Sequence, residues 1–95
     1  HRERLVDDIT RARTFAEGLT GIDGVRVDLD RVRTNIVRYE VTRGTAGAFV
    51  DACHARGVHM LPGGRRGVRA VMHLGIDDRD VARALEVVRG VAAEG

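Results

Sequence analysis

The most informative absence from this 95-residue sequence is lysine, because all 16 basic residues are arginines. A Schiff base with a carbonyl compound requires a lysine amine, so this chain cannot perform such chemistry alone. An arginine side chain instead offers a planar fork of donors that suits a carboxylate or a phosphate. The chain therefore has groups that can hold an anionic substrate, but it lacks an amine that could transform one.

Aromatic residues, cysteine and long apolar runs are also scarce. Phe15, Tyr39 and Phe49 occur singly inside apolar patterns, so we expect no surface on which nucleic-acid bases stack. The formal net charge is only +2, with both signs mixed along the chain, and no apolar run is long enough to span a membrane. We therefore expect neither a nucleic-acid nor a membrane partner. Cys53 is the only cysteine, which excludes an internal disulfide and favours a reducing, cytoplasmic location.

Length and composition predict a single folded domain over residues 1–95. A content of 43% hydrophobic and 32% charged residues is typical of a globular chain rather than a disordered one. This length suffices for one modest core. The sequence begins at His1, directly within a charged helical pattern and without an initiator methionine. We interpret this start as a cut edge, which would make the sequence a truncated form, a proteolytic product or a domain of a longer protein.

The spacing of apolar residues predicts three helices and four strands. The expected helices cover residues 3–19, 45–56 and from 78 onward, and the expected strands cover 25–29, 35–41, 58–61 and 68–74. Gly18 and Gly21 are expected to end the first helix, and Asp77 or Asp78 to cap the last. The order α-β-β-α-β-β-α predicts an α+β fold: a two-layer sandwich with a four-stranded, mainly antiparallel sheet and helices on one face. The last strand should lie between its neighbours, in a split β-α-β arrangement.

Side-chain alternation divides the two longest strands into a buried face and an open face. On the 68–74 strand the side chains expected to face away from the helices are Arg69, Val71 and His73. On the 35–41 strand they are Ile36, Arg38 and Glu40. An uncovered sheet face that mixes apolar and charged residues is typical of a partner-binding surface, and an ordinary solvated face is the alternative.

Arg69 is the main candidate site residue. It is a lone charge in an apolar strand that follows the turn Gly63–Gly67, and a charge in such surroundings needs a partner. That partner is either an anionic ligand or a nearby Asp or Glu in an internal salt bridge, and the sequence leaves both open. Arg65 and Arg66 could help the turn to hold an anion through its backbone N–H groups, but a plain hairpin turn explains the same pattern.

The other reactive side chains favour structural roles. Cys53 lies on the apolar stripe of the second helix, which indicates a buried thiol rather than a nucleophile. The four histidines are not at metal-ligand spacing. Asp77, Asp78 and Asp80 are typical of helix capping rather than of paired catalytic carboxylates. We therefore expect no metal site and no catalytic residue in this chain.

Three motifs carry a resemblance to a known family: Thr34–Val37, the helix-to-strand step Ala55–Val58, and Val68–Leu74. In this order and at this spacing they resemble the C-terminal small domain of L-threonine aldolase, a pyridoxal-phosphate enzyme of the aspartate-aminotransferase-like superfamily (fold type I). The resemblance covers essentially the whole chain. The family pattern carries Thr where Met72 stands and Asp where Gly75 stands, departures that leave room for a related β-eliminating lyase.

The resemblance implies a parent enzyme that uses pyridoxal 5'-phosphate to cleave L-threonine or L-allo-threonine into glycine and acetaldehyde. Arg69 matches the arginine that helps to bind the substrate carboxylate, and Asn35 and His73 lie in matching motifs with expected structural roles. The cofactor lysine belongs to a large domain outside this sequence. The implied partners are that domain and a neighbouring subunit, and the isolated chain should be inactive. The alternative is a stand-alone module that senses amino acids or docks a partner without catalysis.

Overall fold

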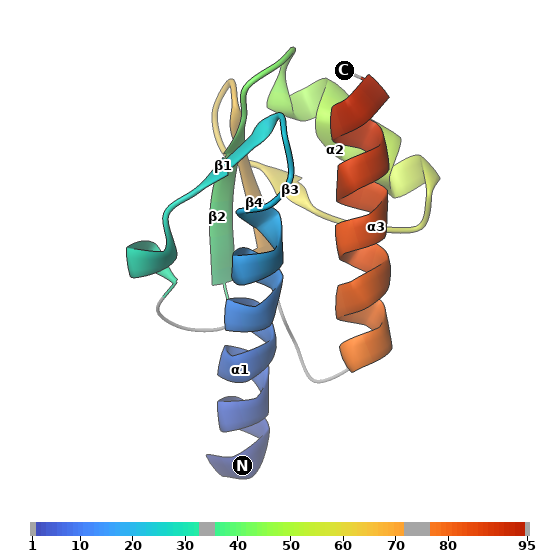
Figure 1. The fold of residues 1–95 in the computed structure, drawn as a ribbon. Helices are drawn as coiled ribbons and strands as arrows, with labels where there is room; N and C mark the ends of the chain where they lie inside the picture. Colours follow the sequence, from blue (N-terminus) through green and yellow to red (C-terminus); the bar gives the residue numbers. More distant parts are fainter. Residues whose placement is uncertain (1, 33–35, 72–76, 95) are drawn as a thin grey trace.

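The computed structural model describes residues 2–32, 36–71 and 77–94, and its elements follow the predicted order (Figure 1). They are α1 (Arg2–Leu19), β1 (Val25–Val27), the 3₁₀ turn η1 (Leu29–Arg31), β2 (Ile36–Val41), α2 (Ala46–Ala55), β3 (Leu61–Pro62), β4 (Gly67–Val71) and α3 (Asp78–Glu94). The α+β class predicted from the sequence is therefore confirmed. Within the described ranges, no helix is long and apolar enough to cross a membrane.

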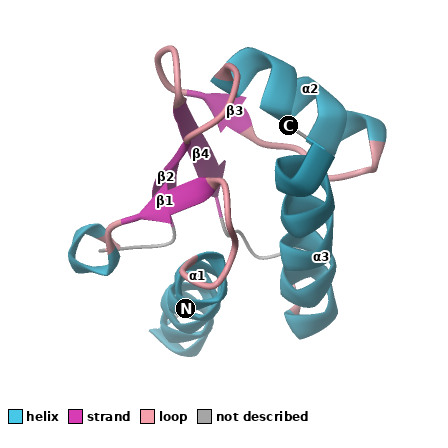
Figure 2. Cartoon of the chain, turned by 45° about the horizontal axis from the view of Figure 1, so that its top comes forward, coloured by secondary structure: helices cyan, strands magenta, loops and turns pink. Residues whose placement is uncertain are grey.

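The strands of the described residues form one antiparallel sheet in the order β1-β2-β4-β3. The strand last in sequence, β4, lies between β2 and β3, while α2 connects those two parallel strands. This is the split β-α-β arrangement predicted from the element order. The helices α1, α2 and α3 pack on one face of the sheet, which confirms the predicted two layers (Figure 2).

Alternation along the two central strands decides which side chains enter the core. The buried side chains of β2 are Val37, Tyr39 and Val41, and those of β4 are Val68 and Ala70. They face the helices, as the period of two predicts. The side chains between them are left on the opposite face, where any ligand or partner of the sheet would meet them.

Tyr39 is the centre of the core. Its ring packs edge-on against Phe15 of α1 and Phe49 of α2, with ring centroids 6.2 and 6.1 Å away. Its hydroxyl donates a hydrogen bond to the sulfur of Met60 at 2.7 Å, so the polar end of the buried ring has a partner. The aromatic residues of the chain thus hold the two layers together.

The strand predicted at 58–61 is present as β3 but begins only at Leu61, because Val58 still hydrogen-bonds to the last turn of α2. Its N–H donates to the carbonyl of Cys53 at 3.0 Å, after Gly57 turns the chain with a φ of 87°. Pairing with β4 begins only at Leu61. The strand that results is short and lies at the edge of the sheet, where a proline is tolerated.

Two other boundaries have local causes. The strand β1 ends at Val27, two residues before the predicted end, because the Asp28 carboxylate accepts the N–H of Asp30 at 3.0 Å and starts η1. Gly18 does not end α1 but lies inside its last turn. A Cβ at that position would come within 2.5 Å of Leu85, so this glycine allows α1 and α3 to pack closely.

Side chains cap the starts of α2 and α3, and the α3 cap is the one that the sequence predicts. The hydroxyl of Thr45 accepts the N–H of Ala48 at 3.3 Å at the start of α2. Asp77 caps α3 reciprocally with Asp80, because the backbone N–H of each residue donates to the carboxylate of the other, at 2.9 and 3.0 Å. Both caps use side chains whose hydrogen-bonding pattern can be recognised in the sequence.

Candidate functional site

The open face of the sheet is organised by strand register. Arg38 of β2 lies directly opposite Arg69 of β4, and Leu61 of β3 lies opposite Arg69 on its other side. Ile36 and Val71 form the neighbouring pair. Because paired residues of adjacent strands point to the same face, two arginines stand side by side among apolar side chains. This row is the candidate site.

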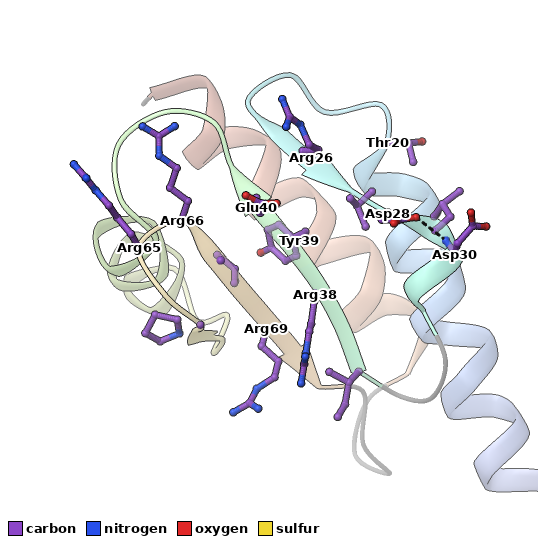
Figure 3. A pocket seen from close by; sticks show the side chains of 17 residues that line it. Thr20, Arg26, Asp28, Asp30, Arg38, Tyr39, Glu40, Arg65, Arg66 and Arg69 are labelled. Atoms are coloured by element: carbon purple, nitrogen blue, oxygen red, sulfur yellow. Dashed lines mark hydrogen bonds between the residues drawn. The ribbon is translucent and has the colours of Figure 1, made fainter.

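The two arginines reach toward the same end of the sheet (Figure 3). Both are exposed, in agreement with the predicted outward orientation of Arg38 and Arg69. Directly opposed residues of antiparallel strands have Cβ atoms about 4.5–5.5 Å apart, so both guanidinium groups can approach one small anion.

Neither the side chain of Arg38 nor that of Arg69 has a hydrogen bond or an ion pair within the described part of the chain. Other arginines are paired: Arg43 contacts Asp23 at 2.8 Å, and Arg56 contacts Glu94. The internal salt bridge that the sequence left open for Arg69 is thus not formed among the described residues. Its guanidinium is available to an external anion.

The open face is hollowed into a shallow concavity of about 1530 Å³. The charged side chains that line it are Arg26, Asp28, Asp30, Arg38, Glu40, Arg65, Arg66 and Arg69. Arginines therefore outnumber carboxylates here, although the whole chain carries a formal charge of only +2. Figure 3 shows Arg65 and Arg66 at one end of the concavity and the pair described above at the other.

Arg69 also borders a second cleft, of about 430 Å³, between β4 and α3. The side chains that line this cleft include the apolar Phe15, Met60, Val71 and Val81 and the charged Asp80 and Arg83. An apolar cleft with a cation at its rim suits a small ligand that combines a carboxylate with an apolar group. The position of Arg69 between the two hollows distinguishes it from the other exposed arginines.

The turn between β3 and β4 is a well-anchored hairpin. The N–H of Gly63 donates to the carbonyl of Gly67 at 2.7 Å, and the carbonyl of Arg65 accepts the N–H of Ala46 at 2.7 Å. These bonds tie the turn to itself and to the start of α2. The hairpin predicted for this segment is confirmed, and anion binding by Arg65 and Arg66 stays a prediction.

The remaining candidates agree with structural roles or lie outside the described residues. Cys53 is buried, and the burial raises the pKa of its thiol to about 11, which makes it a poor nucleophile at neutral pH. The rings of His54 and His59 lie 4.1 Å apart, a contact that the sequence did not predict. Among the described residues, no group of three or more His, Cys, Asp or Glu side chains is placed to hold a metal ion. Asn35 and His73 fall outside the described ranges.

Sequence reasoning placed Arg38 on the open face but did not select it as a site residue. Its importance depends on the pairing of β2 with β4, because only that pairing brings it beside Arg69. The predicted split β-α-β order already implied that these strands are neighbours. Assigning a register to these two predicted neighbours is the step that could have placed Arg38 beside Arg69.

The chain is similar in sequence to a threonine aldolase. It is 34% identical over 85 residues to the probable low-specificity L-threonine aldolase 2 of Arabidopsis thaliana. The match covers 86% of this chain and 24% of the relative, so the chain spans about a quarter of that protein's length. The resemblance inferred from the three motifs is therefore confirmed. No family model matches the chain.

Several solved structures contain a similar fold within a longer chain. Glutamate decarboxylase of Lactobacillus brevis has a TM-score of 0.80 at 18% identity, covering 98% of this chain and 24% of its own. The aminotransferase TlmJ of Streptoalloteichus hindustanus has a TM-score of 0.78 at 16% identity, and the match covers 95% of this chain and 32% of TlmJ. Oryza sativa TDC, solved with PLP and tryptamine, has a TM-score of 0.75 at 20% identity, and the match covers 97% of this chain and 22% of TDC. At these identities the likeness concerns the fold alone.

Proposed function

We propose that this chain is one part of a pyridoxal-phosphate-dependent enzyme that cleaves L-threonine or L-allo-threonine into glycine and acetaldehyde. The observation that carries the proposal is the 34% identity, over 86% of the chain, to a probable low-specificity L-threonine aldolase. Because the chain spans 24% of that relative, the reaction belongs to a longer protein. The large cofactor-binding domain and a neighbouring subunit are the proposed partners.

In this proposal Arg69 anchors the carboxylate of the amino-acid substrate. Three properties support that role: its side chain is exposed, it has no partner among the described residues, and it stands at the rim of an apolar cleft. A guanidinium can hold a carboxylate through two parallel hydrogen bonds, which orients the ligand as well as binding it. An arginine already engaged in an internal salt bridge could not do so without losing that pair.

The residues of this chain do not fit covalent attachment of pyridoxal phosphate, because the sequence contains no lysine. When bound by the longer protein, the cofactor would supply an electron sink for the carbanion left after Cα–Cβ cleavage. The contribution of the present residues is to bind and orient the substrate. Leu61 and Val71 are 51% and 38% exposed on the open face and suit a surface that closes against a partner.

The test is the kinetics of the longer protein that contains this chain. Arg69→Ala lowers kcat/KM for L-threonine about 10–100-fold, because a charge-assisted hydrogen-bonded contact contributes roughly 1.5–3 kcal/mol. Arg26→Ala is the matched control, an arginine of the same concavity on the far strand β1, and it leaves kcat/KM nearly unchanged. A longer protein that does not cleave threonine, or cleavage by the 95-residue chain with added cofactor, contradicts the proposal.

A further inference from the structure

We infer that Arg38 and Arg69 together form a two-arginine site that binds one small carboxylate. The inference rests on the proposed role of Arg69 and adds a second guanidinium to it from within this chain. A single arginine can hold a carboxylate, but two arginines side by side on adjacent strands can donate to both of its oxygens at once. Three observations support the site: the strand register, the lack of an ion pair to either arginine among the described residues, and the apolar side chains beside the pair.

Strand register makes the pair a property of the sheet rather than of two mobile side chains. Arg38 and Arg69 are directly opposed in the β2–β4 ladder, near the middle of five paired positions. Arg69 is paired with β2 on one side and with β3 on the other, and Arg38 is paired with β4. Their backbones are therefore held by the sheet, and only the side chains need to adjust to a ligand. Such pre-organisation reduces the conformational entropy that is lost when a ligand binds.

The carboxylate of β2 on the open face, Glu40, is paired elsewhere in the register. Glu40 lies opposite Arg26 of β1 and Gly67 of β4, one row away from the two arginines. No ion pair joins it to Arg38 or Arg69 among the described residues. Like charges directly opposite each other on adjacent strands destabilise a sheet. An anion held between the two guanidinium groups would relieve this repulsion.

The surroundings favour a carboxylate on a small molecule rather than a polyanion. Leu61 lies beside Arg69 in the same row, and the adjacent row consists of Ile36 and Val71. The apolar cleft next to Arg69 offers room for the rest of such a ligand. A carboxylate has about four lone-pair sites on two oxygens, enough to accept from both arginine forks at once.

The experiment is an NMR titration of the 95-residue chain at constant ionic strength, following the Nε–Hε signals of the arginines. The probes are acetate and glycine, with glycinamide as the ligand that lacks a carboxylate and inorganic phosphate as the competing oxyanion. We expect the signals of Arg38 and Arg69 to shift together with one dissociation constant for acetate and glycine. Glycinamide should cause no such shift.

Single substitutions test whether each of the two arginines contributes to acetate binding. Arg38→Gln and Arg69→Gln should each weaken acetate binding about tenfold or more, the loss expected for one charge-assisted contact. Arg38→Lys, which keeps the charge but loses the planar fork, should recover only part of that loss. Arg26→Gln is the matched control and should bind as the wild type does. The circular dichroism spectrum of each variant confirms that it is folded.

Three results would overturn the inference. Movement of the Arg69 signal alone, with Arg38→Gln binding as wild type, means a one-arginine site and leaves the proposed function intact. Phosphate binding without acetate or glycine binding contradicts the carboxylate class. Equal weakening by Arg26→Gln means that the whole basic face attracts anions without a defined site. Failure of the proposed function is separate, because it shows in the activity of the longer protein and not in this titration.

Discussion

Replacing Arg38 by Gln should make the ligand-free chain more stable, although most surface substitutions are neutral or destabilising. The residue lies directly opposite Arg69, and neither side chain has a carboxylate partner among the described residues. Two unit charges about 6 Å apart in water repel by roughly 0.7 kcal/mol, and cross-strand charge pairs typically contribute about 0.2–1 kcal/mol. We therefore expect a gain within that range at low salt.

The assay is urea unfolding followed by circular dichroism, at low and at high salt. The Debye length is about 30 Å at 0.01 M salt and about 3 Å at 1 M, so the repulsion acts fully at the first concentration and is largely screened at the second. The stability gained by Arg38→Gln should therefore disappear at high salt. The slope of the free energy against urea should stay constant, because the substitution leaves the buried surface unchanged.

Arg26→Gln is the control of opposite sign. Arg26 lies opposite Glu40, so its removal takes away an attraction rather than a repulsion. It should lower stability slightly at low salt, and this effect should also fade as salt is added. If Arg38→Gln is less stable than wild type at low salt, or if its gain is the same at both salt concentrations, Arg38 and Arg69 do not repel each other across the strands.

Three further predictions concern the fold. Burial raises the pKa of Tyr39 above its ordinary value of 10.0. The stability linked to its neutral form is therefore full below pH 10 and falls as the pH rises further. Absorbance at 295 nm, which reports the single tyrosine of the chain, should stay flat past pH 10 until the chain unfolds. Gly67→Ala should lower the free energy of unfolding in urea by about 1–3 kcal/mol, a typical penalty for overpacking. The reason is that a Cβ there would lie 2.3 Å from the carbonyl oxygen of Gly63. An unchanged urea midpoint would exclude the hairpin geometry described above. The backbone N–H of Asp80 lowers the pKa of Asp77 below its ordinary value of 3.8. The stability contributed by the ionised Asp77 carboxylate is therefore full above that pH and is lost as the pH falls further. The urea midpoints of wild type and Asp77→Asn should converge in acid, and a constant difference between them contradicts the cap.

The sequence predicted the layers of this fold because burial follows simple periods. Val37, Tyr39 and Val41 alternate with exposed residues and are buried together. The four stripe residues of α2, Ala46, Phe49, Val50 and Cys53, are all buried as helical spacing requires. These patterns depend only on the local period and on the transfer of apolar groups from water, so one sequence is enough to read them.

The predictions that failed depended on contacts between specific groups. The end of β1 is set by the Asp28 carboxylate, and the late start of β3 by the hydrogen bond from Val58 to the end of α2. Gly18 serves the packing of α1 on Leu85, a tertiary contact that a helix-stop rule cannot anticipate. The pairing of Arg38 with Arg69 similarly requires the order and register of the strands, which lie beyond any local pattern.

Binding of the substrate carboxylate by Arg69 can be measured by comparing two substrates that differ only in that carboxylate. The measurement is the ratio of kcat/KM for L-threonine to that for L-threoninamide, in the longer protein and in its Arg69→Ala variant. The amide lacks the carboxylate charge, so the variant should lose about 10–100-fold on threonine and little on threoninamide. An equal loss on both substrates, or no loss on threonine, would show that Arg69 does not bind the substrate carboxylate.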